Sequence, residues 1–278
     1  MKSNFWSMML GGSLLFASCI SDGINFPDVD LGDGEGKLLL SLTPSADFEA
    51  NTRALNESNY RDQSNYTVEL YKNGDETPFE TFRMSQSGST LPVTVKKGSY
   101  WARAYYGVEH DASRNEFFVE GKSQLVQVNP DGEATIPITC TPTCGKIIVS
   151  FDNEMATYYE TFNVTFGGTQ KLGTNTFVWA ANDIEPWYVA VNEDGETINY
   201  SIYVKVKSQY VYVADNGNKM TEGTATGSFT LQRNRAQRVT IKPSYTPTED
   251  GWLTIQITID DTTNEKEKTF EVPVTWIK

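Results

Sequence analysis

The sequence predicts an all-β protein, and three observations support this fold class. Hydrophobic side chains after residue 36 recur with a period of two, which is the signature of β-strands. Dipeptides that tolerate a positive φ separate these runs, as hairpins require. They are Asn73-Gly74, Asp131-Gly132, Asp194-Gly195, Asn216-Gly217 and Asp250-Gly251. No helical stretch long enough for a crossover lies between the runs, so we expect antiparallel β-sandwiches rather than a parallel α/β sheet.

Residues 1–18 have the features of a lipoprotein signal peptide. Lys2 precedes an apolar segment, residues 8–17, which is too short to cross a bilayer as a helix. The run LFASC at residues 15–19 then leads through small residues into a cysteine. We therefore expect cleavage before Cys19 and acylation of this residue, with several acyl chains giving stable attachment. The expected location is the outer membrane, at the cell surface, although the sequence does not decide between the two faces of that membrane.

Residues 19–35 are predicted to form a lipidated tether. The stretch 28–35 is acidic and contains glycines, a composition that cannot bury enough apolar surface to fold. Its aspartate spacing is similar to that of a calcium loop, but the EF-hand pattern needs Asp or Asn where Gly32 stands, and it needs flanking helices. A solvated linker is therefore preferred to a metal site.

Two β-sandwich domains are expected behind the tether, at residues 36–140 and 145–278. Strand-like alternation is clearest over residues 66–71, 253–259 and 270–276. The run GKLLLSL at 36–42 is matched by GKIIVSF at 145–151, an offset of 109 residues. This offset is close to the size of one immunoglobulin-like sandwich domain. Chance similarity between two buried strands is the alternative, but Thr141-Pro142-Thr143 would still break the extended structure at this boundary.

The charge of the mature chain disfavours nucleic acid as a partner. Removing Lys2 with the signal peptide leaves 22 basic residues (23 − 1) against 36 acidic residues, a net charge of −14 (22 − 36). Such a chain repels phosphate backbones. No apolar run after the signal peptide is long enough to span a bilayer, so we expect everything behind the tether to be soluble.

Two cysteines remain after lipidation, Cys140 and Cys144, in the run Cys-Thr-Pro-Thr-Cys. A disulfide persists outside the reducing cytosol, but it needs the two Cα atoms within about 7 Å. A tight turn at Pro142 meets this requirement and an extended strand does not, so the sequence leaves the bridge open. Zinc is not expected, because His110 is the single histidine and supplies no ligand cluster.

Three common catalytic motifs are missing from the sequence. It contains no Gly-x-Ser-x-Gly elbow, no His-Glu-x-x-His motif and no phosphate loop, and His110 lies between two acidic residues in a polar stretch. A glycosidase needs two carboxylates about 5 to 10 Å apart, which a sequence alone does not reveal. Asp260-Asp261 is better explained as a hairpin turn. We therefore expect no enzyme activity and no cofactor, and a hydrolase is the weakest of the functional hypotheses.

Aromatic residues form the other candidate site. Tyr210 and Tyr212 share one face of a predicted strand, opposite Val211 and Val213. If the valines face the core, the tyrosines and Trp187 offer flat platforms on which sugar rings stack. Packing in the core or at a sheet edge explains the same residues, because aromatics are ordinary strand formers. A glycan-binding outer-membrane lipoprotein is therefore the second hypothesis.

The sequence combines a predicted lipidated cysteine followed by Ser21-Asp22, a first strand at 36–43, a loop with Asn51-Thr52-Arg53-Ala54, and two all-β domains. Together these features resemble fimbrillin-type surface lipoproteins of anaerobic Gram-negative bacteria. The Thr-Arg-Ala loop, the strand start Gly98-Ser99-Tyr100 and the mid-chain cysteine are similar to an uncharacterised family of such lipoproteins. The resemblance implies two transthyretin-like sandwiches and cleavage by a trypsin-like protease after Arg53, which makes Ala54 the new N-terminus.

The implied cleavage has a physical consequence. It frees the strand that carries Leu38, Leu40 and Leu42 on one face, and opens a groove that another subunit's extended terminus fills by strand addition. The run 270–278 is a candidate donor, because Pro273 suits an edge strand. An uncut chain would remain lipid-anchored, as an anchor, a tip subunit or a separate adhesin. The leading hypothesis is therefore a non-enzymatic pilus component or adhesin, with the membrane, pilus subunits or surface glycans as partners.

Overall fold

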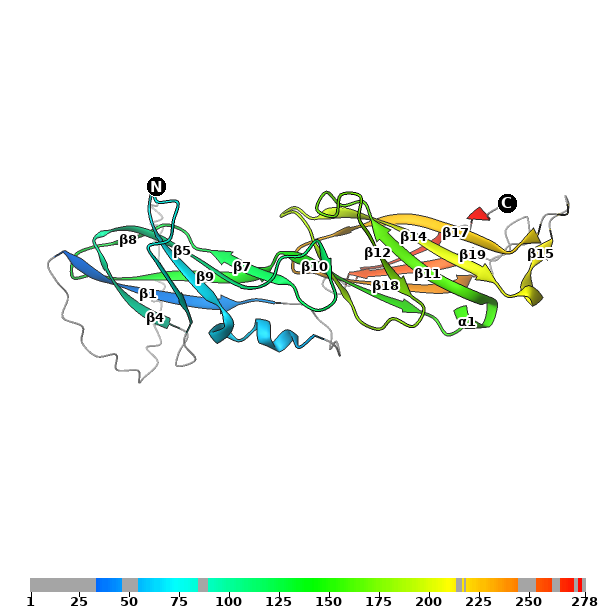
Figure 1. Ribbon diagram of the computed structural model, residues 1–278, viewed down its shortest axis with the longest axis horizontal. Helices are drawn as coiled ribbons and strands as arrows, with labels where there is room; N and C mark the ends of the chain where they lie inside the picture. The colour runs from blue at the N-terminus through cyan, green and yellow to red at the C-terminus, as the bar shows by residue number, and fades with distance from the viewer. Residues whose placement is uncertain are drawn as a thin grey trace, which may run out of the picture.

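The structure is a computed structural model that describes residues 34–46, 55–84, 90–213, 217, 219–244, 254–261, 266–272 and 275–276. Figure 1 shows two lobes joined end to end. The N-terminal lobe spans residues 34–142 and the C-terminal lobe spans residues 144–276, and a hydrophobic core lies in each. Helix is limited, over these residues, to one short α-helix and three 3-10 turns. The prediction of an all-β fold is confirmed.

The elements of the N-terminal lobe are β1 (Glu35–Pro44), η1 (Glu57–Tyr60), η2 (Gln63–Asn65), β2 (Thr67–Lys72), β3 (Glu80–Arg83), β4 (Thr90–Lys96), β5 (Gly98–Gly107), β6 (Ala112–Ser113), β7 (Phe118–Lys122), β8 (Val126–Val128) and β9 (Glu133–Pro142). The elements of the C-terminal lobe are β10 (Cys144–Phe151), α1 (Met155–Tyr158), β11 (Tyr159–Gly167), β12 (Thr176–Ala180), β13 (Trp187–Ala190), β14 (Glu196–Val206), η3 (Ser208–Tyr210), β15 (Tyr212–Val213), β16 (Lys219–Met220), β17 (Glu222–Leu231), β18 (Ala236–Ser244), β19 (Thr254–Asp261), β20 (Lys266–Val272) and β21 (Thr275–Trp276).

Strand β14 illustrates how the sequence produces these elements. Its side chains alternate between buried and more exposed positions along its whole length. Ile198, Ile202 and Val204 are almost completely buried in the core of the C-terminal lobe, whereas Thr197 and Asn199 face solvent. Successive side chains of an extended chain point to opposite faces, so this composition forms a strand with one face in the core.

The two lobes share one pattern of strand connections. In the N-terminal lobe, β2 lies between β3 and β5, β5 pairs with β7, and β1 lies between β4 and β9. In the C-terminal lobe, β11 lies between β12 and β14, β14 pairs with β17, and β10 lies between β13 and β18. The equivalent strands β1 and β10 contain the repeated Gly-Lys runs. The sequence repeat therefore corresponds to a repeated arrangement of strands.

Most strand pairs are antiparallel, as expected, but the structure adds two parallel pairs. β1 runs parallel to β9, and β10 runs parallel to β18. A period of two does not reveal strand direction, because side chains alternate in the same way in both kinds of pair. In both lobes many residues separate the two parallel partners, as a parallel connection requires.

The C-terminal lobe carries strands that have no counterpart in the repeat. β19 pairs with β18, and β20 pairs with β19 at the edge of a six-stranded sheet. β21 pairs instead with β17 of the five-stranded sheet. The run 270–276 therefore divides between two strands in different sheets, where the sequence predicted one strand.

Candidate functional site

The first strand, β1, is paired along both of its edges. It runs antiparallel to β4 and parallel to β9, whose pairing continues to the last residue of β1. Leu38, Leu40 and Leu42 share one face, as expected, and each is at most 1% exposed. Because β1 fills a place between two strands, its loss would expose two strand edges and a strip of apolar core.

A tight corner between β8 and β9, at Asp131 and Gly132, holds the beginning of β1. The backbone N–H of Asp131 donates to the oxygen of Glu35 at 2.7 Å, and the N–H of Lys37 donates to the oxygen of Gly132 at 2.8 Å. Gly36 lies so close to this corner that an added Cβ would be 2.5 Å from a backbone oxygen. A side chain at this position would therefore displace β1 from the corner.

Beyond β1, the chain enters the stretch that contains the predicted cleavage position. Ala46 is buried before this stretch, and Leu55 packs against the core of the N-terminal lobe after it. Arg53 and Ala54 lie outside the residues that the structure describes, and so does Cys19. Cleavage and lipidation therefore stay predictions from the sequence.

Cys140 and Cys144 are both free and buried in the structure, so the bridge that the sequence left open is not formed. β9 continues through Pro142 and β10 begins at Cys144, so no tight turn brings the cysteines together. A bend at Thr143 separates the two strands, and a chain that is extended on both sides of it holds residues four apart at up to about 13 Å, against the 7 Å that a disulfide tolerates. The thiol of Cys140 contacts the oxygen of Ala104 at 3.5 Å instead.

Trp187 covers a sheet edge, which is one of the two roles that the sequence suggested. Its indole N–H donates to the oxygen of Val178 at 3.3 Å. A guanidinium N–H of Arg114 donates to the same oxygen at 3.3 Å, and its guanidinium carbon lies 4.8 Å from the centroid of the Trp187 ring. Val178 belongs to β12, which ends its sheet among the described strands. The two side chains therefore block this edge, and one face of the indole is not free for a sugar.

Tyr210 and Tyr212 do not share a strand face, so this prediction is wrong. Tyr210 closes the 3-10 turn η3, and only Tyr212 lies in the short strand β15. A 3-10 turn has three residues per turn and breaks the alternation of a strand. The Tyr210 ring packs 5.0 Å from that of Tyr158, whereas Trp187 packs against Phe177. Tyr210 and Trp187 therefore pack against different aromatic neighbours and do not form one platform.

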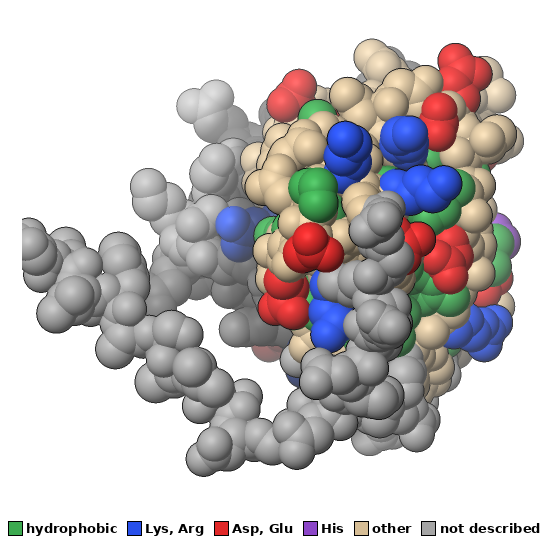
Figure 2. All heavy atoms as spheres, turned by 90° about the vertical axis from the view of Figure 1, so that its left-hand side faces the viewer, with side chains coloured by type: hydrophobic (Ala, Val, Ile, Leu, Met, Phe, Trp, Pro, Cys, Tyr) green, Lys and Arg blue, Asp and Glu red, His purple; other side chains and the backbone are tan. Residues whose placement is uncertain are grey.

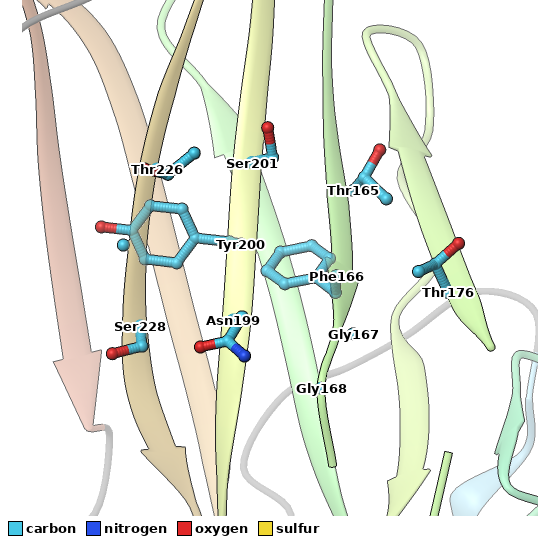
Figure 3. Close-up of a pocket in the computed structure, with 11 residues that line it drawn as sticks. Thr165, Phe166, Gly167, Gly168, Thr176, Asn199, Tyr200, Ser201, Thr226 and Ser228 are labelled. Carbon is cyan, nitrogen blue, oxygen red and sulfur yellow. The ribbon is translucent and has the colours of Figure 1, made fainter. Parts of the chain in front are cut away.

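A shallow depression of about 560 Å³ lies on the exposed face of the five-stranded sheet. Figure 3 shows two rows of small polar side chains across its strands. One row contains Thr165, Ser201 and Thr226, and the next contains Thr176, Asn199 and Ser228. No charged side chain is among the described residues that line the depression, and glycines leave the space open. The sequence pattern gave no sign of it, because serine and threonine on an outer strand face are unremarkable.

A buried ion pair is the polar cluster that the sequence analysis missed. Lys146 on β10 is completely buried, and its Nζ lies 2.6 Å from Oε1 of Glu57 in η1. The hydroxyl of Tyr188 donates to the same carboxylate oxygen at 2.5 Å. Burial lowers the pKa of Lys146, and the carboxylate partly offsets that effect. Lys146 lies 89 positions after Glu57 in the sequence, and Tyr188 lies 131 positions after it. No local sequence pattern therefore signals the cluster.

The remaining charged side chains among the described residues give no sign of a metal centre. Among the described residues, no group of three His, Cys, Asp or Glu side chains is placed to hold a metal. Figure 2 shows basic and acidic side chains interspersed at the end of the molecule formed by the N-terminal lobe. None of the helices in the described ranges has the length and apolar character needed to span a membrane.

Comparison with known proteins gives a family. The family model described as "Domain of unknown function (DUF4493)" matches residues 34–274. The chain belongs to this family. The match to DUF4493 runs through both lobes, from the start of β1 to the end of β20. A search of curated proteins found no match to the chain.

Two solved structures are similar to this DUF4493 member. The fimbrial anchor protein Mfa2 from Porphyromonas gingivalis is 10% identical, with a TM-score of 0.43, over 87% of this chain and 100% of that one. A fimbrial assembly protein from Parabacteroides distasonis is 13% identical, with a TM-score of 0.42, again over 87% of this chain and 100% of that one.

Proposed function

We propose that this DUF4493 protein is a lipid-anchored cell-surface protein of the fimbrillin type, which acts through contact and strand-mediated assembly and not through catalysis. The observation that carries the proposal is the position of β1. This strand lies between β4 and β9 with three leucines in the core, and the chain from Ala46 to Leu55 behind it contains Arg53. One backbone cut after Arg53 would leave β1 bound only by non-covalent contacts.

The energy of those contacts is large enough to matter. Burying three leucine side chains contributes about 6 kcal/mol at roughly 2 kcal/mol each. That is comparable with the whole stability of a small domain, about 5–15 kcal/mol. A molecule that lost β1 would therefore need a replacement strand. An extended terminus of another subunit supplies ladder hydrogen bonds along the edges of β4 and β9, and alternate side chains for the leucine positions.

The proposal assigns the remaining segments as follows. Residues 1–18 are a signal peptide, Cys19 carries the lipid, and residues 19–35 are the tether. Residues 36–140 and 145–278 are two domains, in agreement with the repeated arrangement of strands. The run 270–278 is the candidate donor, because Pro273 suits an edge strand. To act as one extended strand it would have to leave its pairings with β19 and β17. Other pilus subunits are then the expected partners.

The experiment is cleavage of the chain from residue 20 onward by an arginine-specific protease. Arg61 is the matched control, because it follows η1 and donates from Nη2 to the oxygen of Ala46 at 3.3 Å. Proteases need an extended segment, so an arginine held by folded structure should be cut slowly. We expect one cut after Arg53 in the wild type and in Arg61→Gln, no cut at this place in Arg53→Gln, and oligomers that grow with concentration after cleavage.

The outcomes separate the steps of the proposal. Cleavage after Arg53 followed by concentration-dependent oligomers supports strand exchange. A cut protein that remains monomeric and folded contradicts it. If the chain is not cut after Arg53, the polymerisation step is contradicted. The protein is then restricted to the role of an anchor, a tip subunit or a separate adhesin.

Carbohydrate binding is a second candidate, favoured by the depression on the five-stranded sheet. Its hydroxyl and amide groups both donate and accept hydrogen bonds, which suits the hydroxyls of a neutral sugar. Titration with a panel of soluble polysaccharides tests this function. Ser201→Tyr, in the middle of the depression, should abolish binding, and Thr230→Tyr on the same exposed face of β17 should not. Lack of binding across the panel, or equal binding by both variants, would contradict it.

A further inference from the structure

The two lobes meet in a joint that contains structure from both. β6, from the segment between β5 and β7, pairs with β13 of the C-terminal lobe. Tyr188 of β13 is buried in the hydrophobic core of the N-terminal lobe, together with Cys144. Its ring stacks on that of Phe117 at 4.7 Å, which in turn stacks on that of Tyr60 at 3.8 Å. The core of the N-terminal lobe therefore continues into the other lobe.

The Glu57–Lys146–Tyr188 cluster lies within this joint. Glu57 comes from η1 of the N-terminal lobe, and both of its partners come from strands of the C-terminal lobe. Lys146 is fully buried and the Glu57 side chain is only 14% exposed. A buried ammonium needs its carboxylate partner far more than a solvated one does, because water cannot replace it. Rotation of one lobe against the other would separate the pair.

The repeat supplies an internal comparison. Lys37 in β1 and Lys146 in β10 are equivalent residues, because each follows the glycine of its repeated run. The backbone N–H of each also donates to the oxygen of the residue just before the parallel strand, Gly132 or Arg235. Lys37 is only partly buried, whereas Lys146 is inaccessible. The strand position alone therefore does not bury this lysine. The difference arises where the N-terminal lobe covers the end of the C-terminal lobe.

We propose that Glu57 is a latch that holds the two lobes as one rigid body. The carboxylate fixes η1 to β10 and β13, while β6 and the stacked rings fill the rest of the joint. A contact made at the far end of the C-terminal lobe is then transmitted to the end where β1 begins. The inference concerns lobe orientation and does not depend on cleavage, lipidation or assembly.

A distance measurement between the lobes tests the latch. Spin labels are attached at Thr94→Cys on β4 and Thr230→Cys on β17, two exposed positions on strands. Cys140 and Cys144 are buried, and a chain without the added cysteines reports any labelling of them. Pulsed electron paramagnetic resonance is recorded for the wild type, Glu57→Gln and Tyr188→Phe. Glu120→Gln is the matched control, because it removes a carboxylate paired with Arg103 inside the N-terminal lobe.

We expect one narrow distance in the wild type and in Glu120→Gln. Glu57→Gln should lose this narrow distance, and Tyr188→Phe should broaden it less. If Glu57→Gln does not fold, Glu57→Gln/Lys146→Met replaces it, because this pair leaves no unpaired buried charge. A broad distribution in the wild type, or a narrow distance that survives every change to the cluster in folded protein, would overturn the proposal.

Discussion

Asp131 and Asn234 occupy equivalent corners of the two lobes, each with a positive backbone φ, of 55° and 54°. The N–H of Asp131 donates to Glu35 at the start of β1, and the N–H of Asn234 donates to Cys144 at the start of β10. In each lobe this corner leads into the strand that runs parallel to the first strand. The same left-handed backbone conformation therefore positions β1 in the N-terminal lobe and β10 in the C-terminal lobe, although the two corners differ in sequence.

The corner residues should be sensitive to side chains that disfavour this conformation. A left-handed backbone costs an ordinary residue about 1–2 kcal/mol, whereas Asn, Asp and Gly adopt it more easily. We expect Asp131→Ala and Asn234→Ala to lower the free energy of unfolding by about 1 kcal/mol each, and the glycine variants to lower it less. Urea denaturation measures the change, with Asp75→Ala in an exposed turn as control. Alanine and glycine variants of equal stability would show that the corner is not strained.

The leucine face of β1 should account for much of the stability of the N-terminal lobe. Leu40 is fully buried, so Leu40→Ala removes buried methyl groups and leaves a cavity, which costs about 2–5 kcal/mol. Ser41→Ala, on the opposite face of the same strand, should change the free energy of unfolding by less than about 0.5 kcal/mol. Denaturation curves of both variants test this difference. A loss below about 1 kcal/mol for Leu40→Ala would mean that β1 is a weakly bound strand.

Removal of the Tyr159 hydroxyl should stabilise the protein. This side chain is 1% exposed, and its hydroxyl has no hydrogen-bond partner among the residues that the structure describes. An unsatisfied buried polar group costs about 1–3 kcal/mol, so Tyr159→Phe should raise the melting temperature. Tyr66→Phe is the control, because the Tyr66 hydroxyl donates to the oxygen of Tyr60 at 2.6 Å and its removal should lower stability. The idea fails if both substitutions destabilise the protein equally.

Alkaline pH should unfold the protein through its buried thiols and phenols. Burial raises the pKa of Cys140 and of Tyr159 to about 12, from ordinary values of 9.0 and 10.0. Below the ordinary values both groups are protonated in the folded and unfolded states, so their stabilising effect is complete. Above them the unfolded chain loses protons first, and the free energy of unfolding falls as pH rises toward 12. Denaturation at a series of pH values should show a decline that begins near pH 9 and steepens above pH 10.

Two variants separate these contributions. Cys140→Ala should make the decline shallower from about pH 9 upward, although Cys144, whose thiol pKa burial also raises, keeps part of it. Tyr159→Phe should make the decline shallower only above about pH 10. Stability that is constant up to pH 11 would contradict the idea that these groups stay protonated in the fold.

Much of the fold follows from local patterns in the sequence. Leu38, Leu40 and Leu42 alternate with more exposed residues, and this alternation correctly predicts both a strand and its buried face. The matching runs at 36–42 and 145–151 mark strands with the same neighbours in the two lobes. Alternation and turn chemistry act between neighbouring residues, which is why a single sequence reveals them.

The features that the sequence did not reveal depend on contacts between distant residues. The parallel pairs depend on how the chain returns to its first strand, and the pair Lys146–Glu57 joins positions 89 residues apart. Tyr210 fits a strand by its residue type, but the turn η3 takes it out of alternation. Trp187 is aromatic whether it binds a sugar or covers a sheet edge, so composition alone does not distinguish the two roles.

The most direct test of the proposed surface role is mass spectrometry of the protein isolated from its native membranes. The account predicts either a chain that begins at an acylated Cys19, for an anchored molecule, or a chain that begins at Ala54, for a molecule that has lost β1. A chain that retains Met1, carries no lipid and is recovered from the cytosol would contradict it.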